Sequence, residues 1–305
     1  MCLSPITIRR PYNKIDGSRT ETVPCGKCPP CIRTRSKGWV FRLQQESKVH
    51  KTELFLNLTY DEKHVPKNKY GVNTLRKKDL QLFWKKLRKR LHDHYGNKYK
   101  FKYYACGEYG TQTNRPHYHA IIFGLPKLMC VDPQELTDIW GKGHIVLGSV
   151  KGGSIAYVTQ YVHKKAINGL QNVYEQLSKT NPHAWRIKGC EPEFSCMSKK
   201  LGINYITPAM IEYHRENLAA YCTLDGGIKT SMPRYYRDKI FLFKPDGTPD
   251  WEGREKYKLI QEANEEARNL DFEKLFNSDH KKFHEWQLNQ RRIHKKKHNL
   301  NRVTI

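Results

Sequence analysis

Long hydrophobic runs are missing from this sequence. No stretch of its 305 residues approaches the roughly 20 apolar residues that a bilayer-spanning helix needs. The segment from Met1 to Arg10 has no apolar centre of the kind that a signal peptide carries. The mean hydropathy of -0.80 agrees with these absences. They argue against a membrane protein, and we expect no membrane partner.

Acidic residues are also scarce. Only 30 Asp and Glu stand against 55 Lys and Arg, so the formal net charge is +25 at pH 7. A chain this basic attracts a polyanion, and nucleic acid is the first candidate. No segment repeats at the periods of solenoid or propeller proteins. We therefore expect one main domain with appendages.

The cysteines do not form a disulfide framework. Their number, nine, is odd, and three of them crowd together at Cys25, Cys28 and Cys31. Short spacings of this kind are typical of a metal site. Cys2 is the most attractive fourth ligand, which would give a structural four-cysteine zinc (Zn²⁺) site that fixes the N-terminus. An iron–sulfur cluster and unligated thiols are the alternatives. Metal-bound thiolates point to a reducing cytoplasm.

Apolar periodicity predicts an α+β fold. Residues 54–60 (LFLNLTY) alternate in hydrophobicity as a strand does. Residues 74–94 carry apolar side chains at three- and four-residue steps on a basic background, which predicts an amphipathic helix. Residues 99–106 and 117–123 predict strands that pair as antiparallel neighbours across a polar connection.

Further elements follow the second of these strands. Residues 132–141 predict a helix that starts at an Asp-Pro pair and stops at a glycine. Residues 144–147 predict a short strand, and residues 154–165 predict a helix with a serine cap. The charge-rich sequence after residue 250 predicts helices that end in a basic tail. This order of elements indicates an α+β sandwich.

The strongest chemical signal is a His-x-His pair. In a strand, His117 and His119 point to the same face, so both imidazoles can grip one divalent ion. Glu108 lies nine residues before His117, across the predicted turn, and can add a carboxylate oxygen. This ligand set suits Mg²⁺ or Mn²⁺ and leaves an open face for a phosphate. The alternative is a pair of strand histidines that merely face solvent.

Two tyrosines inside the predicted helix at residues 154–165 are candidate nucleophiles. Tyr157 and Tyr161 are four residues apart, which stacks their phenols on one helix face. A phenol with a pKa of about 10 is a poor nucleophile at neutral pH, so it needs a base or a cation that polarises the phosphate. Lys164, on the next turn, can hold phosphate oxygens. Ordinary helix packing is the alternative for the pair.

Four segments, in this order, resemble the HUH endonucleases and, within them, the replication initiators of the Microviridae, especially gokushovirus-like phages. They are residues 55–60 (FLNLTY), 107–110 (GEYG), 115–119 (RPHYH) and 157–164 (YVTQYVHK). The likeness covers about residues 53 to 165, and the cysteine cluster extends it over most of the chain. Tyr118 departs mildly from the family pattern, where a bulky aliphatic residue is common.

The resemblance implies a central antiparallel sheet that carries the histidines, with the tyrosine helix beside the metal. It also implies a metal-dependent enzyme that nicks single-stranded DNA at a replication origin. One tyrosine keeps the 5′ end as a phosphotyrosine and leaves a 3′ hydroxyl for a host DNA polymerase, and the second tyrosine serves in strand rejoining. The implied site residues are the ligands His117, His119 and Glu108, the nucleophiles Tyr157 and Tyr161, and the helper Lys164.

Four segments are expected along the chain. Residues 1–50 form a cysteine-rich, zinc-binding appendage, and residues 51–170 form the HUH catalytic core. Residues 171–250 form an accessory region with DNA contacts, and residues 251–305 form a helical, basic tail. The sequence has no Gly-x4-Gly-Lys-Ser/Thr loop, so strand unwinding is expected from a host helicase.

Two other functions stay open. A plasmid initiator or a single-tyrosine transposase uses the same chemistry, although the paired tyrosines argue against the transposase and the cysteine cluster favours the phage. A zinc-containing nucleic-acid-binding protein without catalysis would share the charge and the cysteines. It would leave unexplained why a His-x-His strand, an upstream glutamate and paired tyrosines occur together.

Overall fold

The contacts in the computed structural model divide the chain into two compact units. One unit is Trp39–Tyr205, and the other joins Met1–Gly38 to Ile206–Ile305. The residues that the structure describes are 2–9, 20–26, 28–110, 113–150, 155, 159, 189–277 and 279–300.

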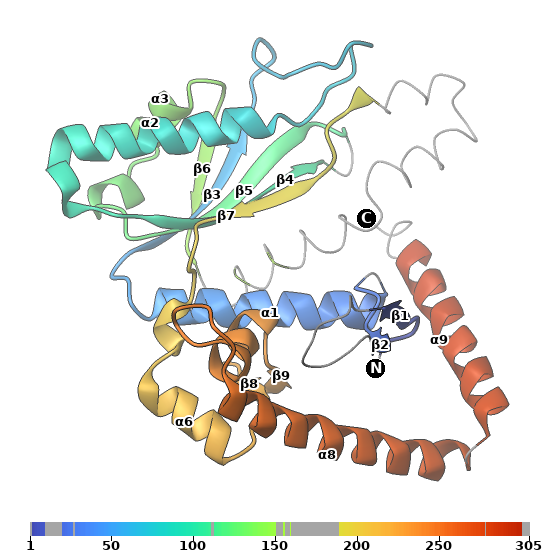
Figure 1. The fold of residues 1–305 in the computed structure, drawn as a ribbon. Coiled ribbons are helices and arrows are strands. Elements are labelled where there is room, and N and C mark those ends of the chain that lie inside the picture. Colours follow the sequence, from blue (N-terminus) through green and yellow to red (C-terminus); the bar gives the residue numbers. More distant parts are fainter. Residues whose placement is uncertain are drawn as a thin grey trace. The chain divides into compact units, whose positions relative to one another are not determined.

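The first unit is built on a five-stranded antiparallel sheet with the strand order β6-β3-β5-β4-β7 (Figure 1). Its strands are β3 (Glu53–Thr59), β4 (Lys102–Tyr109), β5 (Pro116–Phe123), β6 (Ile145–Gly148) and β7 (Phe194–Met197). The predicted pairing of the second and third strands as antiparallel neighbours is confirmed as β4 and β5. β7, which the sequence analysis did not anticipate, extends the sheet beside β4.

Helices α2 (Lys77–Tyr95) and α3 (Gln134–Trp140) cover one face of this sheet (Figure 1). Strand β3 alternates between half-buried and buried residues, and its buried leucines belong to the same core as α2. The apolar side that α2 buries consists of Leu80, Phe83, Trp84, Leu87 and Leu91. α3 ends at Gly141, whose φ of 60° is left-handed and favours glycine. The predicted strand and both predicted helices are confirmed. Short 3-10 turns lie at η1 (Gly96–Lys98), η2 (Leu128–Cys130) and η4 (Ile203–Tyr205).

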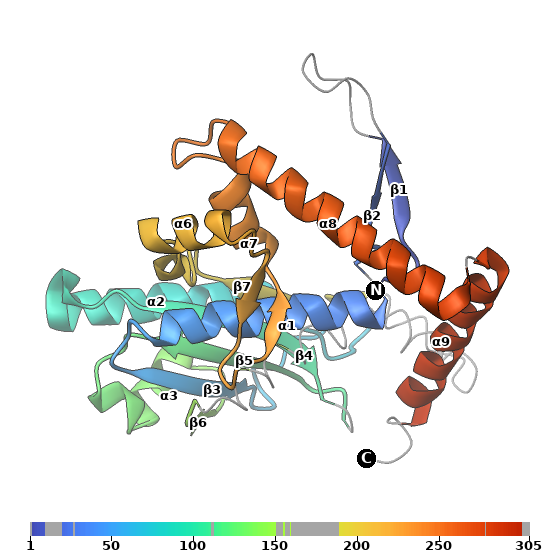
Figure 2. The same ribbon diagram turned by 90° about the horizontal axis from the view of Figure 1, so that it is seen from below.

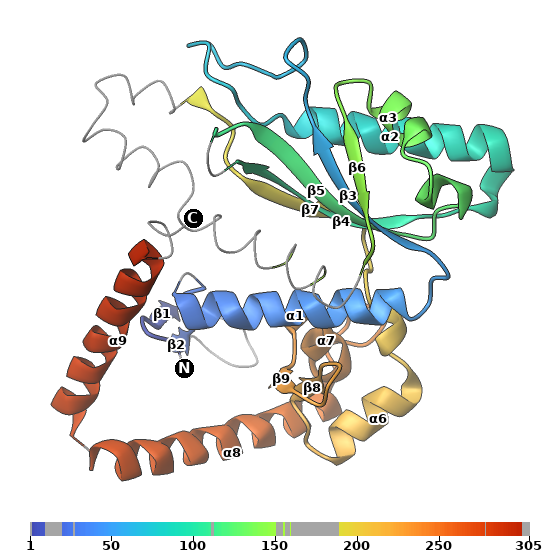
Figure 3. The same ribbon diagram turned by 180° about the vertical axis from the view of Figure 1, so that it is seen from behind.

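The opposite face of the sheet carries a second buried cluster. Its members include Leu43, Tyr104, Ile121, Phe123 and Ile155. Leu43 comes from α1 (Pro29–Ser47), and in Figure 3 the end of this helix lies on the side of the sheet away from α2. Although the sequence suggests an appendage over residues 1–50, residues 39–47 belong to the sheet unit. They do so because their apolar side chains bury this face.

Glu46 is a buried acid, 0% exposed, that ties α1 to the sheet. Its carboxylate lies 2.7 Å from His50 Nε2 and 2.8 Å from Lys102 Nζ, and it accepts the N–H of Gly202 at 2.7 Å. Burial by itself would raise the pKa of Glu46, but these three hydrogen bonds outweigh burial and lower the pKa below its usual value of 4.5. The charged form therefore stabilises the fold.

We expect Glu46→Gln to destabilise the chain by about 2 kcal/mol near neutral pH, because a buried hydrogen bond to a charged group contributes roughly that much. The folded pKa is the lower one, so this stabilisation is complete above pH 4.5 and is lost as the pH falls through the folded value. Denaturant unfolding of both chains at pH of about 7 and about 3 measures the gap, which should narrow in acid.

The control for this prediction is Glu62→Gln, because the Glu62 side chain is 81% exposed. This change should alter the free energy of unfolding by less than about 0.5 kcal/mol. A gap between wild type and Glu46→Gln that is equal at both pH values would contradict the role of the Glu46 charge.

The second unit combines a hairpin, a small sheet and helices. Its elements are β1 (Ile6–Arg9), β2 (Thr20–Val23), α6 (Pro208–Glu216), β8 (Tyr221–Thr223), β9 (Lys229–Ser231), α7 (Arg234–Arg237), the π-helical turn η5 (Asp238–Leu242), α8 (Trp251–Phe276) and α9 (His280–Leu300). Tyr236, Ile240 and Phe241 are fully buried here. The helices predicted after residue 250 are confirmed as α8 and α9 (Figure 2). Within the described part of the chain, no helix has both the length and the apolar character to cross a membrane.

Candidate metal centre

Three side chains predicted to share a metal come together on the sheet face that α1 covers. Glu108 on β4 is the direct partner of His117 on β5. Oε1 of Glu108 lies 2.8 Å from Nε2 of His117 and 2.8 Å from Nε2 of His119. Glu108 and His119 are buried, and His117 keeps 19% of its side chain exposed. The group is therefore reachable from one side only.

The position of Glu108 differs from the expected one. The sequence suggests a polar connection that begins at Gly107, but β4 continues to Tyr109 and holds Glu108 in the ladder. The longer strand is stabilised on its other edge, where Gly107 pairs with Phe194 of β7. A Cβ on Gly107 would lie 2.9 Å from the Phe194 ring, so only glycine allows this close approach. Glu108 thus sits on a rigid strand rather than on a loop.

Each imidazole is oriented by a neighbour. Nδ1 of His117 lies 3.1 Å from the carbonyl oxygen of Arg115, and when Nδ1 carries the proton, it donates to this oxygen. That tautomer leaves the lone pair of Nε2 facing Glu108 and available to a metal. The ring of His119 stacks on Phe55, with the centroids 5.7 Å apart and the planes 16° apart. The two ring positions are therefore set before any ion binds.

This donor set fits a divalent cation. One ligand atom from each of the three residues lies within 4.8 Å of the others. A carboxylate oxygen and two imidazole nitrogens suit ions such as Mg²⁺ or Mn²⁺, and three protein ligands leave coordination positions open. The group can therefore hold a metal ion, and the open positions can accept a phosphate oxygen.

Tyr118, between the two histidines, serves the opposite face of the sheet. Its hydroxyl lies 2.7 Å from that of Tyr60, which donates to Asp79 at 2.9 Å. Tyr118 also donates to the carbonyl of Arg76 and accepts its N–H, each at 3.0 Å. Burial raises the pKa of both tyrosines. The hydroxyl of Tyr118 is thus a structural group that anchors the start of α2.

Asn57 is a residue near the site to which the sequence analysis gave no role. It is the direct β3 partner of His119, so the two side chains share a face and lie close together. Its Oδ1 is buried and has no hydrogen-bond partner among the described residues. The alternation of β3 places Asn57 on the same side as Phe55 and Thr59. Only the strand order adds that this side carries the histidines.

The predicted nucleophiles Tyr157 and Tyr161 and the predicted helper Lys164 lie outside the described residues. Two neighbours in this segment are described. Ile155 belongs to the buried cluster that contains Ile121 and Phe123, which share the His119 side of β5. Thr159 is buried, and its hydroxyl donates to the carbonyl of Ile155 at 2.9 Å. Ile155 therefore packs on the same sheet face as the two imidazoles.

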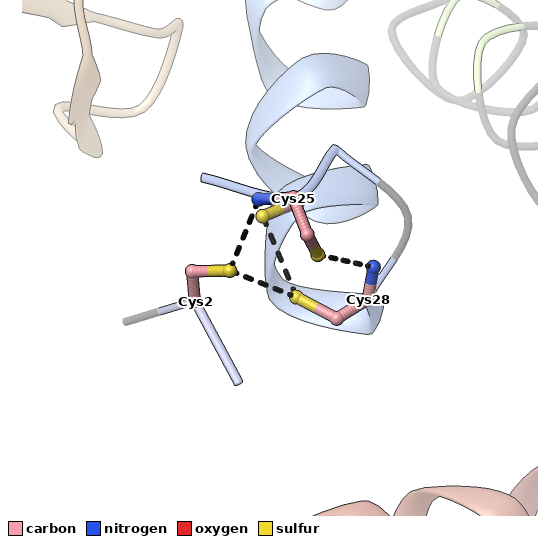
Figure 4. A group of neighbouring side chains, drawn as sticks. Cys2, Cys25 and Cys28 are labelled. Carbon is pink, nitrogen blue, oxygen red and sulfur yellow. Dashed lines mark hydrogen bonds between the residues drawn. The ribbon is translucent and has the colours of Figure 1, made fainter. Parts of the chain in front are cut away.

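The four cysteines predicted to form a second metal site also come together (Figure 4). The Sγ atoms of Cys2, Cys25, Cys28 and Cys31 all lie within 4.8 Å of one another. Burial, followed by the hydrogen bond with Cys28, raises the pKa of the Cys31 thiol to about 12. Four thiolates would repel one another here without a cation. This cluster can hold a metal ion as well.

The sheet and the Glu-His-His group define an α+β protein with a metal site on one face of its sheet. A family model for replication-associated proteins of the ORF2 type matches residues 53–166, which include Glu108 and both histidines. Three curated phage proteins match a larger part of the chain. No solved structure matches the chain.

The three relatives are all replication-associated proteins. ORF4 of Chlamydia phage 1 is 30% identical over 234 residues, 72% of this chain and 53% of that protein. VP4 of Bdellovibrio phage phiMH2K is 28% identical over 80% of this chain and 76% of its own length. ORF2 of Spiroplasma virus 4 is 30% identical over 71% and 67%. The chain thus spans about half the length of the Chlamydia phage protein and more of the other two.

The chain belongs to this family of phage replication-associated proteins. The resemblance to the Microviridae replication initiators is thereby confirmed.

Proposed function

We propose that this protein is a replication initiator with an HUH-endonuclease fold that nicks single-stranded DNA at the origin and later rejoins the strand. The observation that carries the proposal is the meeting of Glu108, His117 and His119 on one sheet face. The family of the chain supports it. The packing of Ile155 on that face supports it further, because Tyr157 follows two residues later.

The reaction transfers a phosphoryl bond without net hydrolysis. The phenol oxygen of Tyr157 or Tyr161 attacks the scissile phosphorus and loses its proton, while the bond from phosphorus to the 3′ oxygen breaks. The 3′ oxygen takes up a proton and leaves as a free 3′ hydroxyl. The 5′ phosphate stays on tyrosine, so a later attack by a 3′ hydroxyl restores the phosphodiester and frees the phenol.

The residues around the sheet divide this work. Glu108, His117 and His119 hold Mg²⁺ or Mn²⁺, which polarises the phosphate under attack and offsets its developing charge. Lys164 holds phosphate oxygens. The cysteine cluster holds a structural Zn²⁺, which is separate from the chemistry.

Other proteins complete replication. Single-stranded DNA at the origin is the substrate, a host helicase opens the duplex, and a host DNA polymerase extends the free 3′ hydroxyl. The protein acts in the cytoplasm of the bacterial host. Residues 51–170 carry catalysis, residues 171–250 add DNA contacts, and the basic residues of 251–305 bind the DNA backbone with strong salt dependence.

The proposal is tested with the full chain, Mn²⁺ and single-stranded oligonucleotides tiled across the phage genome that encodes it. A label at the 3′ end should move with the protein after denaturation, whereas a label at the 5′ end should be released on a fragment with a 3′ hydroxyl. DNA binding without any covalent adduct would instead support a non-catalytic nucleic-acid-binding protein. A label of the opposite polarity on the protein would exclude this mechanism.

Asn57→Ala should weaken Mn²⁺ binding at the Glu-His-His group by about 10- to 100-fold, as changes beside metal ligands do. The buried Oδ1 faces the region of His119 and supplies an oxygen that a divalent cation or its water can use. Calorimetric titration of the purified chain with Mn²⁺ measures the effect. Val146→Ala is the control, since Val146 also pairs with Asn57 but is 59% exposed. Equal affinities for Asn57→Ala and wild type would rule out this role.

A further inference from the structure

The hairpin of β1 and β2 has almost no apolar core of its own. All four residues of β1 are exposed, and Ile6 and Ile8 are 48% and 37% exposed. Thr20 and Thr22 on β2 are exposed as well. A two-stranded hairpin with open faces is marginally stable at best in water. Burial of its own side chains therefore does not hold this hairpin together.

The cysteine cluster lies where the hairpin needs support. Cys2 precedes β1 and Cys25 follows β2, so the two sulfurs mark both ends of the hairpin. Cys28 directly precedes α1, and Cys31 lies in its first turn. Cys28 accepts the N–H of Ile32 with its carbonyl at 3.0 Å, as the residue before a helix does. The four sulfurs thus connect the hairpin to the start of the helix.

The spacing of the sulfurs is that of a tetrahedral metal centre. Sγ of Cys28 lies 3.7 Å from that of Cys2 and 3.4 Å from that of Cys31. A zinc ion with bonds of about 2.3 Å to four sulfurs separates neighbouring sulfurs by about 3.8 Å. Gly26 allows the short turn between Cys25 and Cys28 because its φ is 71°.

Backbone donors surround the same sulfurs (Figure 4). Sγ of Cys2 accepts the N–H of Cys25 at 3.3 Å, and Sγ of Cys25 accepts the N–H of Cys28 at 3.3 Å. Sγ of Cys28 accepts the N–H of Leu3 at 3.4 Å. Such donors stabilise negative sulfur, which is the form that binds metal. The guanidinium of Arg35 lies 3.2 Å from where a Cβ on Gly26 would stand, and its charge has the right sign for a centre with four thiolates and one Zn²⁺.

We infer that Zn²⁺ bound to Cys2, Cys25, Cys28 and Cys31 folds the N-terminal hairpin onto the start of α1, in place of a hydrophobic core. As each sulfur–zinc bond forms, the thiol proton passes to solvent. The free energy of zinc binding is then the free energy that orders this hairpin. The inference is independent of the nicking reaction, since it concerns a different metal at a different place in the chain.

Metal analysis and hydrogen exchange of the full chain test the inference. The purified protein should hold about one zinc ion per chain. Amides of residues 6–9 and 20–23 should be protected from exchange with zinc, should lose protection when a chelator removes it, and should regain protection when zinc alone is added back. Protection that survives zinc removal would overturn the inference, as would iron in place of zinc.

Matched serine variants locate the ligands. Cys25→Ser should lower the zinc content at least about 10-fold and remove the hairpin protection, with Mn²⁺ binding at the Glu-His-His group retained. Cys130→Ser is the control, because this half-buried cysteine lies outside the cluster. It should keep both the zinc and the protection. A Cys25→Ser chain with full zinc content would overturn the ligand assignment.

A second variant covers the case in which Cys25→Ser does not fold. Cys2→Ser changes only the sulfur that precedes β1, so α1 and its two cysteines stay in place. With Co²⁺ as the probe, wild type should give the absorption bands of a tetrahedral four-thiolate site, and Cys2→Ser should give weaker charge-transfer bands from three thiolates. Identical Co²⁺ spectra for both chains would remove Cys2 from the site and sink the inference.

Discussion

His119→Ala should abolish metal-dependent cleavage of single-stranded DNA. The variant removes one of the two imidazoles that face Oε1 of Glu108 and leaves His117 as the only one. A bound cation contributes several kcal/mol to reactions at phosphate, so the rate of adduct formation should fall by about 1,000-fold or more. Single-turnover formation of the adduct from a 3′-labelled oligonucleotide in Mn²⁺ measures the change.

His144→Ala is the matched control for this prediction. His144 is an exposed histidine whose carbonyl, not its ring, accepts the N–H of Thr59. This variant should cleave at the wild-type rate. Mn²⁺ titration should show weaker binding for His119→Ala alone, which separates loss of the ion from loss of the fold. Wild-type cleavage by His119→Ala would mean that the Glu-His-His group is not the catalytic metal centre.

The local patterns of the sequence predict most of the sheet unit. The alternation in β3 and the apolar stripe of α2 are set by periodicity within each element, and both elements form where expected. The stop of α3 at Gly141 follows from a single residue with a left-handed backbone. His117 and His119 share a face for the same local reason, because a strand repeats every two residues.

Non-local pairing is what the sequence does not reveal. The extension of β4 to Tyr109 depends on β7, which is more than 80 residues away in the chain, as the 84-residue separation between Tyr109 and Glu193 illustrates. Without that pairing, Gly107 looks like the start of a turn. Asn57 is similar, because its place beside His119 depends on which strand pairs with β3. Leu43 is buried only because a sheet forms beside α1.

The double variant Tyr157→Phe, Tyr161→Phe should form no covalent adduct with DNA. Phenylalanine keeps the ring and removes only the hydroxyl that forms the bond to phosphorus. Mn²⁺ binding and DNA binding should stay as in wild type, since the ligands and the basic surface are unchanged. Tyr213→Phe, at an exposed tyrosine of the other unit, is the control and should form the adduct normally.

The single variants separate initiation from termination. If the two phenols act in turn, Tyr157→Phe and Tyr161→Phe should each still nick the origin once, because one nucleophile remains. Neither should release closed single-stranded circles, since cleavage of the regenerated origin needs a second phenol while the first holds the 5′ end. Electrophoresis of the products on a circular template distinguishes nicking from circle closure. An adduct in the double variant, mapped to another residue by mass spectrometry, would overturn the nucleophile assignment and leave the metal centre standing.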